Sequence, residues 1–222
     1  MRRPHELVNG KIYHVMNKSI AGFTIFHSQA DYNRMLDMIR FFSYEGPLPK
    51  FSKFRSKKGV QQHGFAAYAM REIQNQKLVD IISYCLMPTH IHLALRQNLE
   101  GGISTYMGNL LNTYARYFNI KRKRQGRLWM GPFKNVEVVS DEQLLHLTRY
   151  HHLNPSTAGL VKRPENWVFS SYTEYIKPAT VDFPLCKFDD LLNIEPKEYQ
   201  ALTNDQKDFQ RELAKIKHLV LD

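Results

Sequence analysis

Two histidines separated by one aliphatic residue, His90 and His92, are the pair in this sequence whose spacing most directly indicates chemistry. They lie in the run PTHIHLALR of residues 88–96, which alternates as a β-strand does. Because successive side chains of a strand point to opposite faces, both imidazoles share one face and Ile91 lies on the other. Two neighbouring imidazoles can hold one divalent metal ion and leave room for a third ligand and a substrate. A purely structural histidine pair is the alternative, and the pair alone does not decide between the two.

A second candidate group lies on a predicted helix. Residues 140–143, Ser-Asp-Glu-Gln, have the form of a capping box, which predicts a helix that begins at Asp141. We expect it to end near Asn154, because the following Pro155 disfavours helical geometry in the residue before it. On this helix Tyr150 and Asn154 are four residues apart and therefore lie on the same side.

The side chains of His90, His92, Tyr150 and Asn154 can act at one site if the predicted helix crosses the sheet. Neutral imidazoles of His90 and His92 and the side-chain oxygen of Asn154 would supply three metal ligands, compatible with Mg²⁺ or Mn²⁺ when phosphate oxygens and water complete the shell. Tyr150 would then lie one helical turn from the metal. A phenol with a pKa of about 10 is a poor nucleophile at neutral pH, so it needs proton removal and a polarised electrophile such as a metal-bound phosphodiester.

Other histidines and tyrosines have simpler interpretations. Tyr114 falls on the apolar stripe of a predicted helix, where an aromatic residue is more often core than catalytic, and Tyr117 lies on the same helix. His151 and His152 are expected to contact DNA or to cap the end of their helix. His14, on the first strand, is either a partner behind the metal ligands or a plain buried histidine, and we leave it out of the catalytic set.

The composition favours a polyanionic partner. Lys and Arg outnumber Asp and Glu by 31 to 21, for a net charge of +10, which favours nucleic acid first and an anionic membrane surface second. No apolar run approaches a membrane span, and no signal-peptide pattern follows the basic N-terminus. The only cysteines, Cys85 and Cys186, are too isolated for a zinc motif and fit buried free thiols. We therefore expect a cytoplasmic, nucleoid-associated protein with no membrane partner.

Periodicity predicts an α+β fold with the element order β-α-β-β-α-β, as in ferredoxin-like (RRM-like) domains. The expected strands are residues 11–17, 78–86, 90–97 and 133–139, and the expected helices begin at Ser28 and span residues 103–119. Pro88 marks the turn between the second and third strands. In such a fold both helices cover one face of the sheet, and the other face stays open to bind something.

The remaining segments complete the expected organisation. Residues 46–64, rich in Pro, Lys, Ser and Gly, are predicted to be an exposed basic loop, and residues 66–75 a short helix. Residues 157–175 are expected to form turns and a short helix that packs back on the core. From residue 178 the chain changes character, which divides it into a domain of residues 1–177 and a helical extension of residues 178–222, with an amphipathic, charged helix over 204–221.

A run of cations after the second predicted helix is the candidate DNA-binding segment. Four adjacent cations exceed what a helix end needs, so we expect the run to bind phosphates. Trp129, just beyond it, is expected to be a core anchor rather than a base-stacking ring. The candidate DNA-binding residues are Lys121, Arg122, Lys123, Arg124 and Arg127.

Three linked motifs give the chain a family resemblance. They are YCLMPTHIH at residues 84–92, GRLW at 126–129 and RYHHLNPSTAGLV at 149–161. In this order and spacing the chain resembles the HUH-superfamily single-tyrosine transposases of the insertion-sequence type, especially REP-associated tyrosine transposases, over about residues 10–175.

This resemblance implies a function. It implies that His90 and His92 are metal ligands, that Tyr150 is the nucleophile and that Asn154 takes the position of the third ligand. The implied reaction is metal-dependent cleavage of single-stranded DNA at hairpin-associated sites, through a 5′-phosphotyrosyl intermediate that another 3′-hydroxyl can reverse. The resemblance further implies a homodimer that recognises imperfect DNA hairpins.

Two other functions are weighed against this one. A non-catalytic, regulatory protein that binds single-stranded nucleic acid needs only the open sheet face and basic flanks, and would not need Tyr150 with its three partners. A histidine-based nucleotide hydrolase is expected to carry a third histidine at position 94, where this chain has Ala94. We therefore expect an enzyme that nicks and joins DNA.

Overall fold

The centre of the fold is a four-stranded antiparallel sheet. The structure, a computed structural model, describes residues 6–205. The strands are β1 (Ile12–Lys18), β2 (Val79–Met87), β3 (His90–Gln97) and β4 (Lys134–Val138), in the spatial order β2-β3-β1-β4. All three pairings are antiparallel, so β1 and β2 run parallel to each other with β3 between them. This is the split βαβ arrangement of ferredoxin-like domains, and the predicted α+β fold is confirmed.

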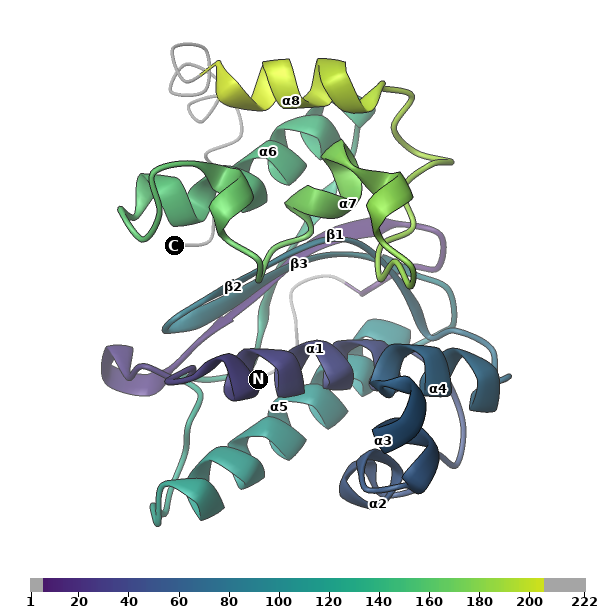
Figure 1. The fold of residues 1–222 in the computed structure, drawn as a ribbon, viewed down its shortest axis with the longest axis vertical. Helices are drawn as coiled ribbons and strands as arrows, with labels where there is room; N and C mark the ends of the chain where they lie inside the picture. Colours follow the sequence, from purple (N-terminus) through teal and green to yellow (C-terminus); the bar gives the residue numbers. More distant parts are fainter. Residues whose placement is uncertain (1–5, 206–222) are drawn as a thin grey trace.

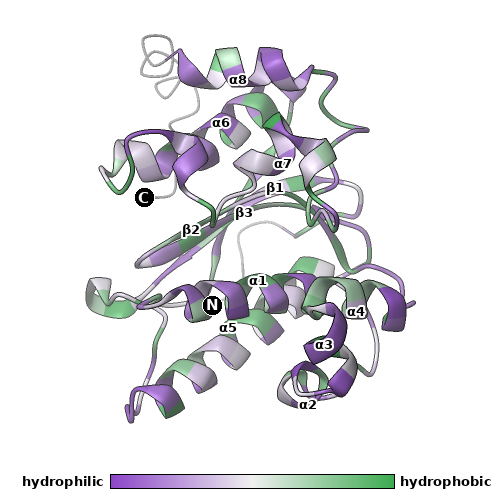
Figure 2. Cartoon of the chain, in the orientation of Figure 1, coloured by the Kyte–Doolittle hydropathy of each residue, from purple (hydrophilic) through white to green (hydrophobic). Residues whose placement is uncertain are grey.

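Two long helices, α1 (Gln29–Phe42) and α5 (Gly102–Lys121), cover one face of the sheet (Figure 1). In Figure 2 each helix carries both hydrophobic and hydrophilic residues, as expected for helices with one packed face. Their apolar side chains meet those of the alternate strand residues, including Val15, Leu93 and Leu95, in the larger core of the protein. The strand alternation seen in the sequence therefore places the packing face correctly.

The second face of the sheet is not open, contrary to expectation. It is covered by α6 (Asp141–Thr157) and α7 (Tyr172–Ile176), and α8 (Pro196–Asn204) packs on these two helices on the side away from the sheet (Figure 1). Ile82 and Ala94 of the sheet belong to a second core with side chains of these helices. The strand pattern does not predict that helices cover this face, because the periodicity of one strand does not indicate what packs on its other face.

Helix α6 also runs past the point where the sequence predicts its end. It begins as predicted, since Ser140 Oγ accepts a hydrogen bond from Gln143 N, 3.2 Å away. Pro155 lies inside the helix, and Ala158 N donates to the carbonyl of Asn154 at 2.9 Å beyond it. Pro155 has no N–H to donate, so the chain loses one bond of the ladder but keeps the turn that follows. The bias of a pre-proline residue is a preference that packing on the sheet overrides.

Residues 46–64 are also more ordered than expected. The predicted loop contains α2 (Phe51–Arg55) and α3 (Lys58–His63), and both Phe51 and Phe54 are buried in the larger core. Gly59, which counts as a loop signal in sequence, lies directly against the ring of Tyr68, and a Cβ there would clash with it. Its small size therefore permits close packing rather than marking a flexible loop. The predicted helix after this segment is confirmed as α4 (Phe65–Glu72).

The segment after α6 returns to the sheet, as predicted. It contains two short 3₁₀ helices, η2 (Pro164–Asn166) and η3 (Pro178–Thr180), and another, η1 (Ile20–Gly22), follows β1. Between η2 and α7, Trp167 Nε1 donates to the carbonyl of Leu86 on β2 at 3.1 Å.

Three further expectations concern the whole chain. Both cysteines are free thiols, and Cys85 is buried as expected, whereas Cys186 is half-buried. None of the helices between residues 6 and 205 has the length and apolar content needed to cross a membrane. The predicted helix over residues 204–221 lies almost entirely outside the described residues, and the domain boundary after residue 177 stays a prediction.

Candidate active site and its histidine cluster

The four side chains predicted to act together do lie together. His90 and His92 project from β3 and Tyr150 and Asn154 from α6. The ring centroids of His92 and His90 are 4.8 Å apart, and those of His92 and Tyr150 are 5.5 Å apart. Asn154 Nδ2 lies 3.3 Å from His92 Nε2. His92 is thus the central residue, in contact with each of the other three.

Exposure differs among these four residues. His92 and Tyr150 are buried, with 0% and 6% of their surface exposed, whereas His90 and Asn154 are half-buried. A substrate would therefore approach from the side of His90 and Asn154. His90 Nδ1 lies 2.9 Å from the Thr89 hydroxyl, so a hydrogen bond from the hairpin turn orients the ring.

Two histidines outside the predicted set complete a buried cluster around His92. His14 Nε2 lies 3.1 Å from His92 Nδ1, and the ring of His151 lies 5.0 Å from that of His14 and 5.6 Å from that of His92. One ring nitrogen from each of these three residues lies within 4.8 Å of the other two, so the cluster can hold a metal ion. His151 Nδ1 bonds to Ser83 Oγ at 2.8 Å, and its Nε2 is buried with no hydrogen-bond partner.

These positions agree with one of the two interpretations of His14 and correct the expectation for His151. His14 lies where a partner behind the predicted ligands is expected, with its Nε2 against His92 Nδ1. The antiparallel register pairs His14 with Ala94, whose small side chain leaves space for the imidazole beside His92. A third imidazole thus reaches this face from β1 rather than from position 94. A scan for histidines on the same face of two strands would have found His14, once β1 and β3 were taken as neighbours.

The expectation for the histidines after Tyr150 is wrong, because both are buried. His152 bonds through Nδ1 to the hydroxyl of Tyr199 at 2.6 Å and through Nε2 to Ser171 Oγ at 2.8 Å. These two hydrogen bonds connect α6 to α8 and to the start of α7. The His152 side chain therefore neither caps a helix nor faces a DNA strand. Burial lowers the pKa of His152 to about 3, so the ring is neutral.

Burial also keeps His92 and His151 of the cluster neutral. It lowers the pKa of His92 well below the usual value, and the neighbouring His14, His90 and His151 add to the effect because two adjacent imidazolium charges would repel. The pKa of His151 is likewise lowered, first by burial and then by His14 and His152. A neutral imidazole keeps the lone pair that a metal ion requires.

The other tyrosines of interest have structural roles. Tyr114 is fully buried, and its hydroxyl donates to the carbonyl of Ile25 at 2.7 Å, which confirms that it belongs to the core. Tyr117 donates to Asp31 Oδ1 at 2.6 Å on the far side of the sheet from Tyr150. Trp129 is buried with its Nε1 bonded to the carbonyl of Leu111 at 2.9 Å, so the prediction of a core anchor is also confirmed.

The five cations of the candidate DNA-binding segment divide into two groups. Lys121 forms an ion pair with Asp31 at 2.5 Å, and Arg124 bonds to the Asn119 side chain and to the carbonyl of Arg127. The side chains of Lys121 and Arg124 thus stabilise the C-terminal end of α5. The other three are exposed and point their charge at solvent; they are Arg122, Lys123 and Arg127.

Comparison with known proteins relates part of this chain to transposases. A profile of the family described as "Transposase IS200 like" matches residues 53–152. This segment is similar to the IS200-like transposases. The match includes His90, His92 and Tyr150 but stops before Asn154, whose place in the site rests on the geometry described above.

A solved structure extends this similarity, at the level of the fold, to most of the chain. A REP-associated tyrosine transposase bound to a REP hairpin superposes with a TM-score of 0.53 at 14% sequence identity. The superposition covers 87% of this chain and 94% of that one, which shows a shared fold. No curated protein sequence matches the chain.

Proposed function

We propose that this protein is an enzyme that cuts and rejoins single-stranded DNA, with Tyr150 as nucleophile. The observation that carries the proposal is the position of His92, which contacts His90, Asn154 and Tyr150 at the junction of β3 and α6. The family match of residues 53–152 supports an activity on DNA.

The residues present fit a divalent metal ion. His90, His92 and Asn154 would hold it, since the two imidazoles offer ring nitrogens, that of His92 in the neutral form, and a half-turn of the Asn154 amide presents its oxygen at the place of Nδ2. The donor set, of mixed nitrogen and oxygen type, suits Mg²⁺ or Mn²⁺. Such an ion would supply positive charge against the oxygens of the scissile phosphate.

The reaction itself needs one bond exchange at phosphorus. The phenol oxygen of Tyr150 forms a bond to the phosphate while the bond from phosphorus to the 3′-oxygen breaks. Tyr150 loses its proton and the departing 3′-oxygen gains one, so protons balance. The product is a 5′-phosphotyrosyl link and a free 3′-hydroxyl, and attack by another 3′-hydroxyl restores a phosphodiester and the phenol. No nucleotide cofactor is consumed.

The structure weighs against the rival interpretation as a simple binder of single strands. That interpretation needs an open sheet face, and α6 and α7 cover it. The proposed substrate is single-stranded DNA with hairpin structure, as in the hairpin complex of the similar transposase. A homodimer stays a prediction from the family resemblance.

The test is a covalent adduct. We expect the protein, incubated with a pool of single-stranded DNA hairpins and Mg²⁺ or Mn²⁺, to give a protein–DNA species that survives a denaturing gel. Tyr150→Phe should abolish this species, because it removes the attacking oxygen, and a chelator should do the same. Tyr106→Phe is the matched control, since the buried Tyr106 hydroxyl has no hydrogen-bond partner and lies on α5.

Two results would count against the proposal. An adduct that persists in Tyr150→Phe would assign the nucleophile to another residue. Retained DNA binding with no adduct from any hairpin in the pool would favour the non-catalytic binder.

A further inference from the structure

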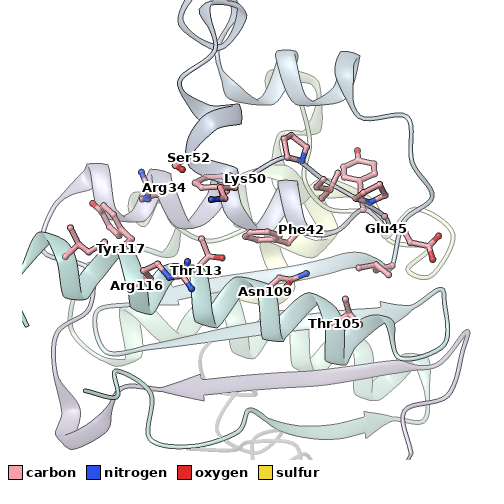
Figure 3. Close-up of a pocket in the computed structure, with 18 of the residues that line it drawn as sticks. Arg34, Phe42, Glu45, Lys50, Ser52, Thr105, Asn109, Thr113, Arg116 and Tyr117 are labelled. Atoms are coloured by element: carbon pink, nitrogen blue, oxygen red, sulfur yellow. The ribbon is translucent and has the colours of Figure 1, made fainter. Parts of the chain in front are cut away.

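A cavity of about 830 Å³ lies on the α1 and α5 side of the sheet, away from Tyr150 (Figure 3). Its floor is a stripe along α5, and its opposite wall is the segment that begins at Tyr44 and enters α2. The stripe residues recur at helical spacing, as Asn109, Thr113, Arg116 and Ile120. Its volume lies within the range of ligand pockets, about 300–1,000 Å³.

Arg34 is the most distinctive residue of this cavity. Its guanidinium carbon lies 4.2 Å from the ring centroid of Tyr117 and 5.3 Å from that of Phe51, so two aromatic faces hold the group. Its Nε is buried and has no hydrogen-bond partner. Asp37, the acidic residue one turn along α1, is bonded to Arg55 instead, at 2.9 Å. Among residues 6–205 no carboxylate forms an ion pair with Arg34.

The cations of the cavity gather at one end. Figure 3 shows Arg34, Lys50 and Arg116 close to Tyr117, whereas Glu45 lies at the opposite end. Lys50 and Arg116 are exposed side chains that can turn toward a ligand. A planar guanidinium held in place, flanked by two movable cations, matches the geometry of a phosphate group, which accepts paired hydrogen bonds from arginine.

We propose that this end of the cavity binds a phosphate group of nucleic acid, and that the occupant is a phosphodiester of single-stranded DNA. Beyond Lys121, whose charge is paired with Asp31, the exposed cations Arg122 and Lys123 follow α5, so a DNA strand can pass from the cavity along a basic surface. The site does not depend on the chemistry of Tyr150, which lies on the other side of the sheet. A free nucleotide carries the same phosphate chemistry, and the experiment separates the two sources.

The experiment measures binding in the Tyr150→Phe background, so that it does not depend on the proposed cleavage. Fluorescence anisotropy follows a labelled, unstructured oligonucleotide of about twelve nucleotides over a range of salt concentrations. We expect Arg34→Gln to weaken binding about tenfold, because a charge-assisted hydrogen bond is lost. Arg116→Gln, at an exposed position that does not threaten folding, should lower the slope of log K against log salt by about 0.7.

Matched controls separate the cavity from general charge. Lys197→Gln removes one exposed cation from α8, in the layer on the other side of the sheet, and should leave the salt slope unchanged. Arg34→Lys keeps the charge but loses the planar guanidinium, which can donate two parallel hydrogen bonds to one phosphate. This variant should therefore bind the oligonucleotide more weakly than the parent protein does. Thermal unfolding confirms that each variant is folded.

The outcomes are distinct. If a deoxynucleoside monophosphate displaces the oligonucleotide from the parent protein and fails to bind Arg34→Gln, the phosphate site stands and its occupant is a free nucleotide. Equal affinity and equal salt slope in the parent, Arg34→Gln and Arg116→Gln proteins would overturn the proposal. Either result leaves the test of Tyr150 unaffected.

Discussion

At the scale of single residues, His92 uses its two ring nitrogens on two different partners. Nδ1 faces His14 Nε2 at 3.1 Å, and Nε2 faces Asn154 at 3.3 Å. A neutral imidazole carries one N–H. If His14 Nε2 accepts the Nδ1 proton of His92, the lone pair of His92 Nε2 is directed to the side of Asn154, where the proposed metal ion would lie. We expect His14 to fix this tautomer.

The prediction is that His14→Phe lowers the affinity for Mn²⁺ by about 10- to 100-fold. The phenyl ring fills the space but cannot accept the proton, whereas the carbonyl oxygen of His14→Gln can, so this variant should keep part of the affinity. Titration followed by electron paramagnetic resonance of free Mn²⁺ measures the binding without any DNA. The exposed His63, changed to Phe, is the matched control. Parent-like Mn²⁺ affinity in a folded His14→Phe protein would assign His14 a packing role only.

At the scale of elements, Asp31 joins the start of α1 to the end of α5. Asp31 Oδ1 accepts hydrogen bonds from Tyr117 and Lys121, and Oδ2 accepts from His27 N and from Ser28 Oγ. Ser28 is the N-cap residue as predicted, but its hydroxyl donates to this carboxylate and makes no cap bond to the backbone. Burial raises the pKa of Asp31, yet the hydrogen bonds outweigh burial and lower the pKa to about 2.

A pH dependence follows from this carboxylate. Because its pKa is lower in the folded chain than the ordinary 3.8, Asp31 stabilises the fold above pH 4 and loses this contribution as the pH falls toward 2. We expect Asp31→Asn to reduce the free energy of unfolding by roughly 1–3 kcal/mol at pH 7. The difference from the parent should shrink below pH 3. Urea unfolding at several pH values measures both, and a constant difference down to pH 2 would contradict the assignment.

At the scale of the whole molecule, the segment after residue 177 contacts the domain before it. The buried Glu174 carboxylate on α7 accepts hydrogen bonds from Leu185 N at 2.9 Å and Cys186 N at 2.8 Å. The ring of Phe188 stacks on that of Tyr175 at 3.8 Å. These contacts, together with the bond from Tyr199 to His152, cross the predicted domain boundary.

We expect a chain ending at residue 177 to unfold more easily than the full chain, by at least about 3 kcal/mol, because Glu174 and His152 would lose partners that burial makes necessary. Chemical denaturation followed by circular dichroism measures the difference. A chain ending at residue 205 keeps every contact described above and is the comparison. Equal stability of the chains ending at 177 and 205 would establish residues 1–177 as an independent domain.

Local patterns in the sequence determined much of this protein. The two-residue period of a strand places His90 and His92 on one face, and the spacing of four on a capped helix aligns Tyr150 with Asn154. The same reasoning predicts the element order and both core aromatics, Tyr114 and Trp129. These features follow from the sequence because each depends on residues near one another in the chain.

Only the tertiary structure decided what surrounds those groups. His14 meets His92 through the register of two strands whose partners lie nearly eighty residues apart. His152 bonds to Tyr199 because α8 packs on α6. Lys121, which belongs to the basic run in sequence, forms an ion pair with Asp31. Periodicity is a property of one segment, whereas strand register and layer order arise from contacts between distant segments. For that physical reason the sequence indicates the chemical groups, and the fold decides which neighbours tune them.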